Sequence, residues 1–170
     1  ILSKPVTRSE FLLGKFGGLL VTVWIQLLLM ALAFAAVSLL VGAGFNLGHA
    51  AALFLVGIEL MVIVAVATLF SSFTTPMLSA LFTLGIYVLG HLSRNLYFLG
   101  QQSDAESVQN AATLIYRVLP DLESFNLSLE AAHGLPISAG DVTLATLYGV
   151  AYSVVLLVLA AFIFHRRDLE

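Results

Sequence analysis

Three ionisable residues in apolar surroundings could carry chemistry. Glu59 lies in the middle of the run VGIELMV, where a carboxylate in lipid is costly unless it is protonated, paired or hydrated. His91 and Arg94 are three residues apart and therefore share one face of a helix, where they could gather an anionic group or extend to lipid headgroups. An intramembrane enzyme using Glu59 and His91 would require the two side chains to meet on facing helices.

The sequence contains no motif of a known catalytic or metal centre. G-x-S-x-G, H-E-x-x-H and phosphate-binding loops are all absent, so we expect no enzymatic activity and no ATP hydrolysis on this chain. We also expect no metal site, because no two histidines have the spacing of metal ligands on one face. The four histidines are His49, His91, His133 and His165.

The composition indicates that lipid, not water, surrounds most of the chain. Of its 170 residues, 60% are hydrophobic and only 10% are charged, whereas a soluble domain has about 25% charged residues. The net charge of −3 and the lack of a basic run argue against a nucleic-acid partner.

Four long apolar runs predict membrane-spanning helices at residues 16–41, 50–70, 77–99 and 142–164. A spanning helix needs about 20 apolar residues, and the third run is marginal because its most apolar part covers only residues 77–92. Strict alternation of apolar and polar residues, which a membrane barrel requires, is absent. We therefore predict an all-α membrane protein with a single transmembrane domain.

The basic residues predict the orientation of these spans. Lys4, Arg8 and Lys15 precede the first span, and Arg166 and Arg167 follow the last, so these ends hold five of the seven basic residues. Four spans place both ends on one side, which the positive-inside rule makes cytoplasmic. The tail at 165–170 is then cytoplasmic, as is the segment 1–15.

The connection at residues 100–140 is predicted to lie outside. It carries five acidic residues against a single arginine, Arg117. Within it, SVQNAATLIYRV has apolar residues at helical spacing, and Pro120 should end that helix. Such an amphipathic helix either covers the bundle at the membrane surface or dips back into it.

The basic opening stretch has two interpretations. Pro5 prevents a helix from running through Lys4, while Thr7 and Glu10 fit a capping box that would start a new helix at Arg8. The exposed bend with Lys4 and Arg8 could anchor to lipid phosphates, or it could dock a cytoplasmic partner.

Several stretches resemble the permeases of ABC-2-type transporters, which are the membrane subunits of a class of ABC exporters. ILSKPVTRSEFLLGKF resembles their cytoplasmic loop, and ATLFSSFTTPMLSALFTLGIYVLGH resembles a hairpin with the helix that follows it. VLPDLESFNL resembles the outer segment before their last helix, and FIFHRRDL their cytoplasmic end. Together these matches cover nearly the whole chain in the right order.

The resemblance implies both an architecture and a set of partners. Members usually have six spans in the inner membrane, so this chain would be the later four and would follow two further spans. The loop carries a coupling helix that seats in an ATPase subunit, which holds the ATP and Mg²⁺; two permease copies, identical or paralogous, pair in the membrane. The residues carried over as the ATPase contact are Ser3, Lys4, Pro5, Val6, Thr7, Arg8, Ser9 and Glu10.

The polar residues within the spans leave alternatives open. Gln26, Thr22 and Ser38 are expected to bond between helices, and Glu59 either faces a translocation path or holds neighbouring helices together. A permease would use Gln26, Glu59, His91 and Arg94 along its path and move a substrate outward by alternating access. The alternative is a non-transporting membrane anchor or assembly subunit, in which the basic residues bind only lipid.

Overall fold

The computed structural model describes residues 8–42 and 44–166, with side chains over 10–42 and 44–164. Helices make up most of this part of the chain, and no strand occurs among the described residues. The elements in chain order are α1 (Arg8–Leu40), α2 (Leu47–Ser71), α3 (Pro76–Gln101), α4 (Glu106–Val118), the 3₁₀ helix η1 (Leu122–Phe125), α5 (Ser128–Ala132) and α6 (Ala139–Arg166).

Four of these helices are long and apolar enough to cross a membrane. They cover Glu10–Leu40, Leu47–Ser71, Pro76–Gln101 and Ala139–Phe164, so the prediction of an all-α membrane protein with four spanning helices is confirmed. The third, α3, is the least apolar of the four but is one unbroken helix of 26 residues. It begins with Pro76 at its first turn, a position where the missing proline N–H costs nothing.

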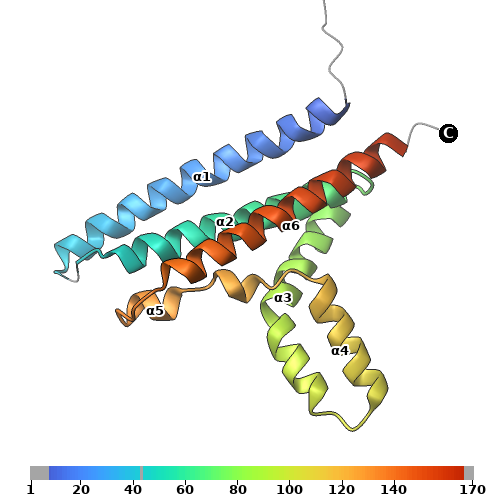
Figure 1. Ribbon diagram of the computed structural model, residues 1–170. Coiled ribbons are helices and arrows are strands. Elements are labelled where there is room, and N and C mark those ends of the chain that lie inside the picture. Colours follow the sequence, from blue (N-terminus) through green and yellow to red (C-terminus); the bar gives the residue numbers. More distant parts are fainter. Residues whose placement is uncertain (1–7, 43, 167–170) are drawn as a thin grey trace, which may run out of the picture.

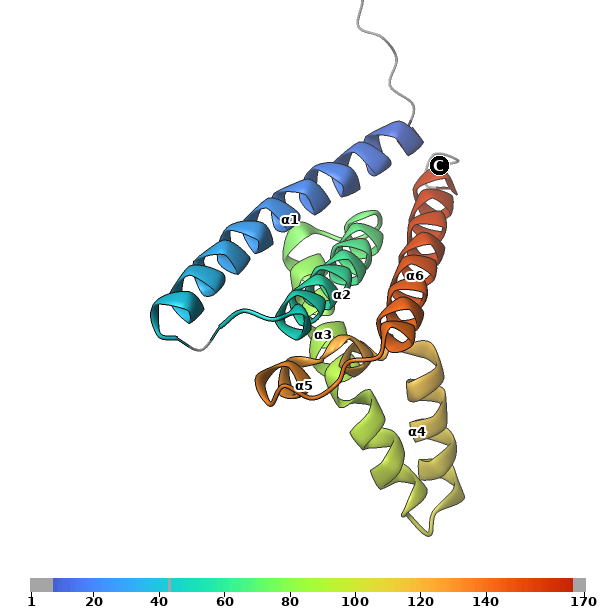
Figure 2. The same ribbon diagram turned by 60° about the vertical axis from the view of Figure 1, so that its left-hand side comes forward.

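Helix α2 is the centre of the molecule. It contacts α1, α3, α5, α6 and η1, and Figures 1 and 2 show α1 and α6 running along it on different sides. The described start of α1 and the end of α6 lie at the same end of the molecule in both views. This arrangement agrees with four spans that leave both ends of the chain on one side of a membrane.

The segment between α3 and α6 has two parts. Its first helix, α4, ends before Pro120 as the sequence predicts and packs against the second half of α3 in a hairpin that projects from the other helices (Figures 1 and 2). The second part returns to the bundle as η1 and α5. Ala112 of α4 lies so close to Gly100 of α3 that no side chain would fit at position 100.

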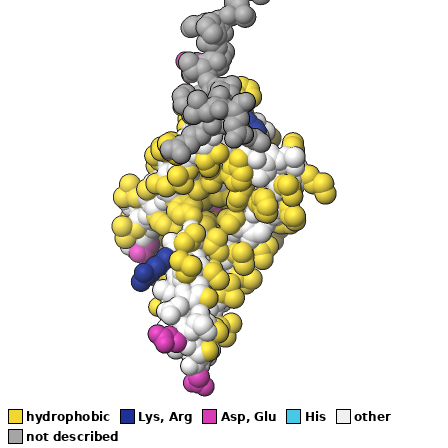
Figure 3. All heavy atoms as spheres, turned by 90° about the vertical axis from the view of Figure 1, so that its right-hand side faces the viewer, with side chains coloured by type: hydrophobic (Ala, Val, Ile, Leu, Met, Phe, Trp, Pro, Cys, Tyr) yellow, Lys and Arg dark blue, Asp and Glu magenta, His cyan; other side chains and the backbone are white. Residues whose placement is uncertain are grey.

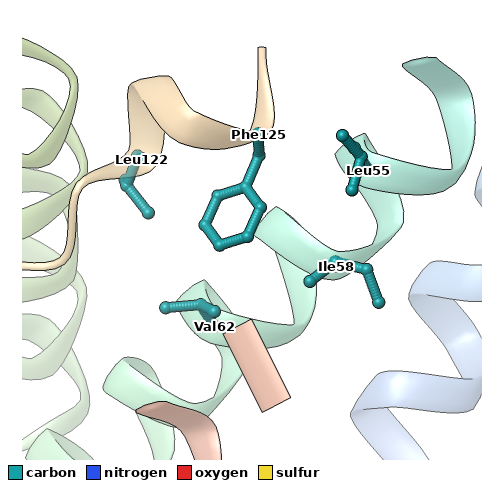
Figure 4. Packing of buried hydrophobic residues seen from close by; sticks show 5 residues of the cluster. All are labelled: Leu55, Ile58, Val62, Leu122 and Phe125. Atoms are coloured by element: carbon teal, nitrogen blue, oxygen red, sulfur yellow. The ribbon is translucent and has the colours of Figure 1, made fainter. Parts of the chain in front are cut away.

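The main hydrophobic core joins α2 to η1. Leu55, Ile58 and Val62 of α2 pack with Leu122 and Phe125 of η1, as Figure 4 shows. Leu122 and Phe125 are fully buried. A second cluster lies nearer the other end of α2, where it meets α6, and consists of Ala65, Val66 and Leu156.

The outer surface of the long helices is apolar. Large hydrophobic side chains are exposed along α1, α3 and α6, as expected for helices that face lipid. Figure 3 shows hydrophobic side chains over most of the upper part of one face, with acidic side chains gathered at the lower tip, where α3 and α4 join.

Close packing of α6 against α2 depends on Gly149. A Cβ at this position would overlap Cγ2 of Ile58 and approach Cε1 of Phe125 to 3.0 Å. We expect Gly149→Ala to lower the free energy of unfolding by about 1–3 kcal/mol, the usual cost of an overpacked core. Thermal unfolding in detergent, followed by circular dichroism, measures the effect.

Gly85→Ala is the matched control for this variant. Gly85 also lies within a long helix, and among the described residues nothing approaches its Cβ position within 4 Å. The gain in helix propensity is the same at both positions, so a stability loss confined to Gly149→Ala isolates the steric effect. Equal melting temperatures for the two variants would contradict the close approach of α6 and α2.

Candidate functional site

Glu59 and His91 meet on facing helices. Oε1 of Glu59 in α2 lies 3.4 Å from Nε2 of His91 in α3, and Glu59 is 8% exposed. His91 Nδ1 lies 3.1 Å from the carbonyl oxygen of Tyr87 one turn earlier. Because a carbonyl only accepts hydrogen bonds, this contact places a proton on Nδ1. One further proton, carried either by the carboxyl group or by Nε2, would join the two groups in a hydrogen-bonded pair without net charge.

The meeting of Glu59 and His91 satisfies the geometric requirement of the intramembrane-enzyme hypothesis. An enzyme of this kind also needs an activated nucleophile or a metal-bound water. Within the described part of the chain, no three histidine, cysteine, aspartate or glutamate side chains gather where they could hold a metal ion. What the structure shows directly is a polar contact between α2 and α3.

Arg94 lies one turn beyond His91 and binds η1. Its Nη2 donates to Oδ2 of Asp121 at 2.9 Å and to Oγ of Ser124 at 3.3 Å. Ser124 Oγ in turn donates to the same Asp121 oxygen at 2.8 Å. The other oxygen of Asp121, Oδ1, is buried and has no hydrogen-bond partner among the described residues. His91 and Arg94 thus each face an acidic side chain of their own chain.

Two tyrosines of α6 fix the chain on either side of Pro120. The backbone N–H of Asp121 donates to the hydroxyl of Tyr148 at 3.0 Å, and the hydroxyl of Tyr152 donates to the carbonyl of Val118 at 2.9 Å. Sequence reasoning missed both residues. Their signal was the spacing of four, which places both hydroxyls on the same face of an otherwise apolar helix.

A polar pocket of about 800 Å³ opens beside this network. It lies between α4, η1 and α6, and two arginines, four acidic residues and three tyrosines contribute to its walls. Its volume is in the range of small-molecule sites. The residues that carry its polar character are Arg94, Tyr116, Arg117, Asp121, Glu123, Ser124, Asn126, Glu130, Asp141, Tyr148 and Tyr152.

The three polar residues of α1 for which bonds to other helices were predicted lie in different surroundings. Thr22 donates to the carbonyl of Gly18 in its own helix at 2.9 Å, so the prediction of a bond to another helix is wrong for Thr22. The hydroxyl of a helical threonine reaches the carbonyl four residues earlier without any neighbour. Gln26 is exposed on α1, whereas Ser38 is buried.

The predicted ATPase contact falls mostly outside the described residues. This is so for Ser3, Lys4, Pro5, Val6 and Thr7, and for the side chains of Arg8 and Ser9. Helix α1 is described from Arg8 onward and has the exposed Glu10 in its first turn. Seven residues after Arg8, Lys15 Nζ donates to Oγ of Ser71 at 2.9 Å and links α1 to the end of α2.

Comparison with models of known protein families identifies the family of the chain. The family model described as ABC-2 family transporter protein matches residues 1–169, nearly the whole chain. The chain belongs to this family. The comparisons with curated proteins and with solved structures found no significant match.

Family membership gives the site its context. The protein is a multi-pass membrane permease subunit of an ABC transporter, and membership implies association with an ATP-binding-cassette ATPase subunit. The family consists of membrane transport components that are not themselves catalytic. In this permease the contact between Glu59 and His91 is accordingly interpreted as a polar link between α2 and α3.

A double-mutant cycle tests this link. In His91→Leu the buried Glu59 carboxyl loses its partner, whereas Glu59→Leu leaves a half-buried imidazole that still bonds to the Tyr87 carbonyl. We therefore expect His91→Leu to be the more destabilising variant. The loss of unfolding free energy in the double variant should be smaller than the sum of the losses in the two single variants by about 1–2 kcal/mol. Thermal unfolding in detergent measures all three losses.

Gln26→Leu provides the control for this cycle. Gln26 is exposed on α1, so its effect should simply add to that of His91→Leu. Additive effects of Glu59→Leu and His91→Leu would mean that the two side chains do not interact.

Proposed function

We propose that this permease moves its substrate outward by alternating access, driven by ATP hydrolysis on a separate subunit. In this proposal the segment Ser3–Glu10 is the coupling segment that contacts the ATPase, and two permease copies pair in the inner membrane. The start of α1 and the end of α6 face the cytoplasm. Their position at one end of the molecule supports this orientation (Figure 1), as does the concentration of basic residues near both.

The observation that carries the proposal is the continuity of α1. It is one helix of 33 residues, about 50 Å long at 1.5 Å per residue, and it exceeds the roughly 30 Å hydrocarbon core of a bilayer. A helix of this length transmits a displacement at its first turn to its far end without an intervening hinge. A push on the coupling segment would therefore reach the turn between α1 and α2.

The substrate path is proposed to run along the polar side chains of α2, α3 and α6. Glu59 and His91 lie between α2 and α3, and Arg94 continues this line of polar groups to the pocket of about 800 Å³ beside η1. Gln26 is exposed on α1, so it would reach such a path only after a movement of α1 or through a second copy.

The alternative function is that of a non-transporting membrane anchor or assembly subunit. In that case Lys4, Arg8 and Lys15 bind only lipid headgroups, and Glu59 only holds helices together. The two functions differ in what the coupling segment does, because an anchor does not need it for ATP turnover.

Charge reversal of the coupling segment distinguishes the two functions. We expect the double variant Lys4→Glu, Arg8→Glu to reduce co-purification of the partner ATPase, because it places acidic groups at the proposed contact. We also expect at least a tenfold loss of coupled ATPase activity in proteoliposomes, about 1.4 kcal/mol or more of coupling free energy. Immunoblotting of the purified complex and phosphate release measure the two effects.

Arg166→Glu, Arg167→Glu is the matched control. It changes the net charge by the same amount at the other cytoplasmic end of the chain. The ATPase should stay bound and active in this variant. Full ATPase binding and full coupled activity in the Lys4, Arg8 double variant would remove the coupling role and favour the anchor.

A further inference from the structure

A groove of about 610 Å³ lies between α1, α2 and α3 near the start of α1. Most of its wall is apolar and includes Leu19 of α1, Ile63 and Ala67 of α2, and Ala80 and Leu84 of α3. These side chains belong to helices long and apolar enough to cross a membrane. A membrane around these helices would bring the groove into contact with lipid.

One end of this groove is polar and carries a positive charge. Lys15 lines it, together with the hydroxyl groups of Ser71 and Thr74. Lys15 is exposed, and its Nζ uses one of three possible donors, for Ser71 Oγ at 2.9 Å. Of the described residues that line the groove, none is acidic. The charge of Lys15 thus has no counter-ion within the groove.

The first turn of α3 adds a second positive element at this end. Pro76, its first residue, lines the groove. The side chain of Thr75, which precedes it at the N-cap position, makes no capping hydrogen bond to this turn. The first N–H groups of a helix lack partners within the helix, and the helix dipole favours an anion there. The hydroxyls of Ser71 and Thr74 donate to carbonyl oxygens of α2, so Lys15 and the start of α3 are the two elements that favour an anion at this end of the groove.

We infer that this groove binds an anionic phospholipid of the membrane. The phosphate lies at Lys15 beside Ser71 and the first turn of α3, and an acyl chain lies along the apolar wall formed by Ile63, Ala67 and Ala80. The match is one of shape and charge, since an amphiphile with one anionic end has the same division as the groove. Basic pockets between spanning helices bind anionic headgroups in the same way.

This site differs from general attraction of basic residues to the membrane surface. Surface attraction needs only positive charge, whereas the groove requires both Lys15 and an unfilled apolar wall. Two variants separate these requirements. Lys15→Gln removes the charge and keeps a side chain of similar length, and Ala80→Trp fills the groove from α3, where Ala80 is exposed.

The experiment is native mass spectrometry of the full permease complex, purified in detergent with phosphatidylglycerol or with phosphatidylcholine. Wild-type protein should retain phosphatidylglycerol in preference to phosphatidylcholine. Lys15→Gln should weaken the retention of phosphatidylglycerol about fivefold, the effect of one basic residue near a membrane surface. Lys15→Arg should restore it, and Ala80→Trp should lower the retention of both lipids.

One control variant accompanies this experiment, and three results would contradict the proposal. Arg167→Gln, which removes one positive charge near the other end of the chain, should leave lipid retention unchanged. Equal retention of the two lipids by the wild type, or unchanged retention of phosphatidylglycerol in Lys15→Gln, overturns the proposal. Loss of the second permease copy from the complex in Ala80→Trp, with lipid retention unchanged, would overturn it too, because a protein segment then occupies the groove.

Discussion

The return of η1 onto α2 is the contact on which the rest of the packing depends. Leu122 and Phe125 are fully buried against Leu55, Ile58 and Val62, and burying a large apolar side chain contributes about 1.5–3 kcal/mol. Asp121, directly before this short helix, accepts a hydrogen bond from Arg94 of α3, and its backbone N–H donates to the hydroxyl of Tyr148 of α6. Asp121, Leu122 and Phe125 thus connect α2, α3 and α6.

This connection also makes charged groups tolerable in apolar helices. Arg94 and His91 lie in a helix apolar enough to span a membrane, where an unpaired charge is expensive. Arg94 is compensated by Asp121, and His91 lies against the carboxyl group of Glu59. The partners come from α2 and from the start of η1, so these two pairs fix both the position of α3 and its orientation about its own axis.

The sequence predicts the spanning helices well because hydropathy is a property of each segment by itself. Glu59 and His91 were identified for the same reason, as ionisable residues in apolar runs. The core role of Leu122 and Phe125 was not predicted, since they lie in a short acidic stretch, DLESF, whose periodicity is that of neither a helix nor a strand. Their burial depends on where the chain returns after α4. Thr22 was assigned wrongly because its hydroxyl donates to a carbonyl oxygen of its own helix. The polarity of the residue alone does not distinguish such a bond from a bond to another helix.

Helices α1 and α2 differ in how much packing holds them. None of the described residues in the most apolar stretch of α1 is buried, against 44% in α2. Helix α1 is held near its start by Lys15 and Ser71, in its middle by Trp24 against Gly57, and near its end by Phe34 against His49. Moving α1 over α2 breaks these contacts and the packing of Phe16 and Trp24 against the two clusters. Moving α6 separates Gly149 from Phe125, and moving α3 breaks the contacts of His91 and Arg94. A transition that keeps the core and its contacts with α3 and α6 would displace α1, which is the helix that follows the proposed coupling segment.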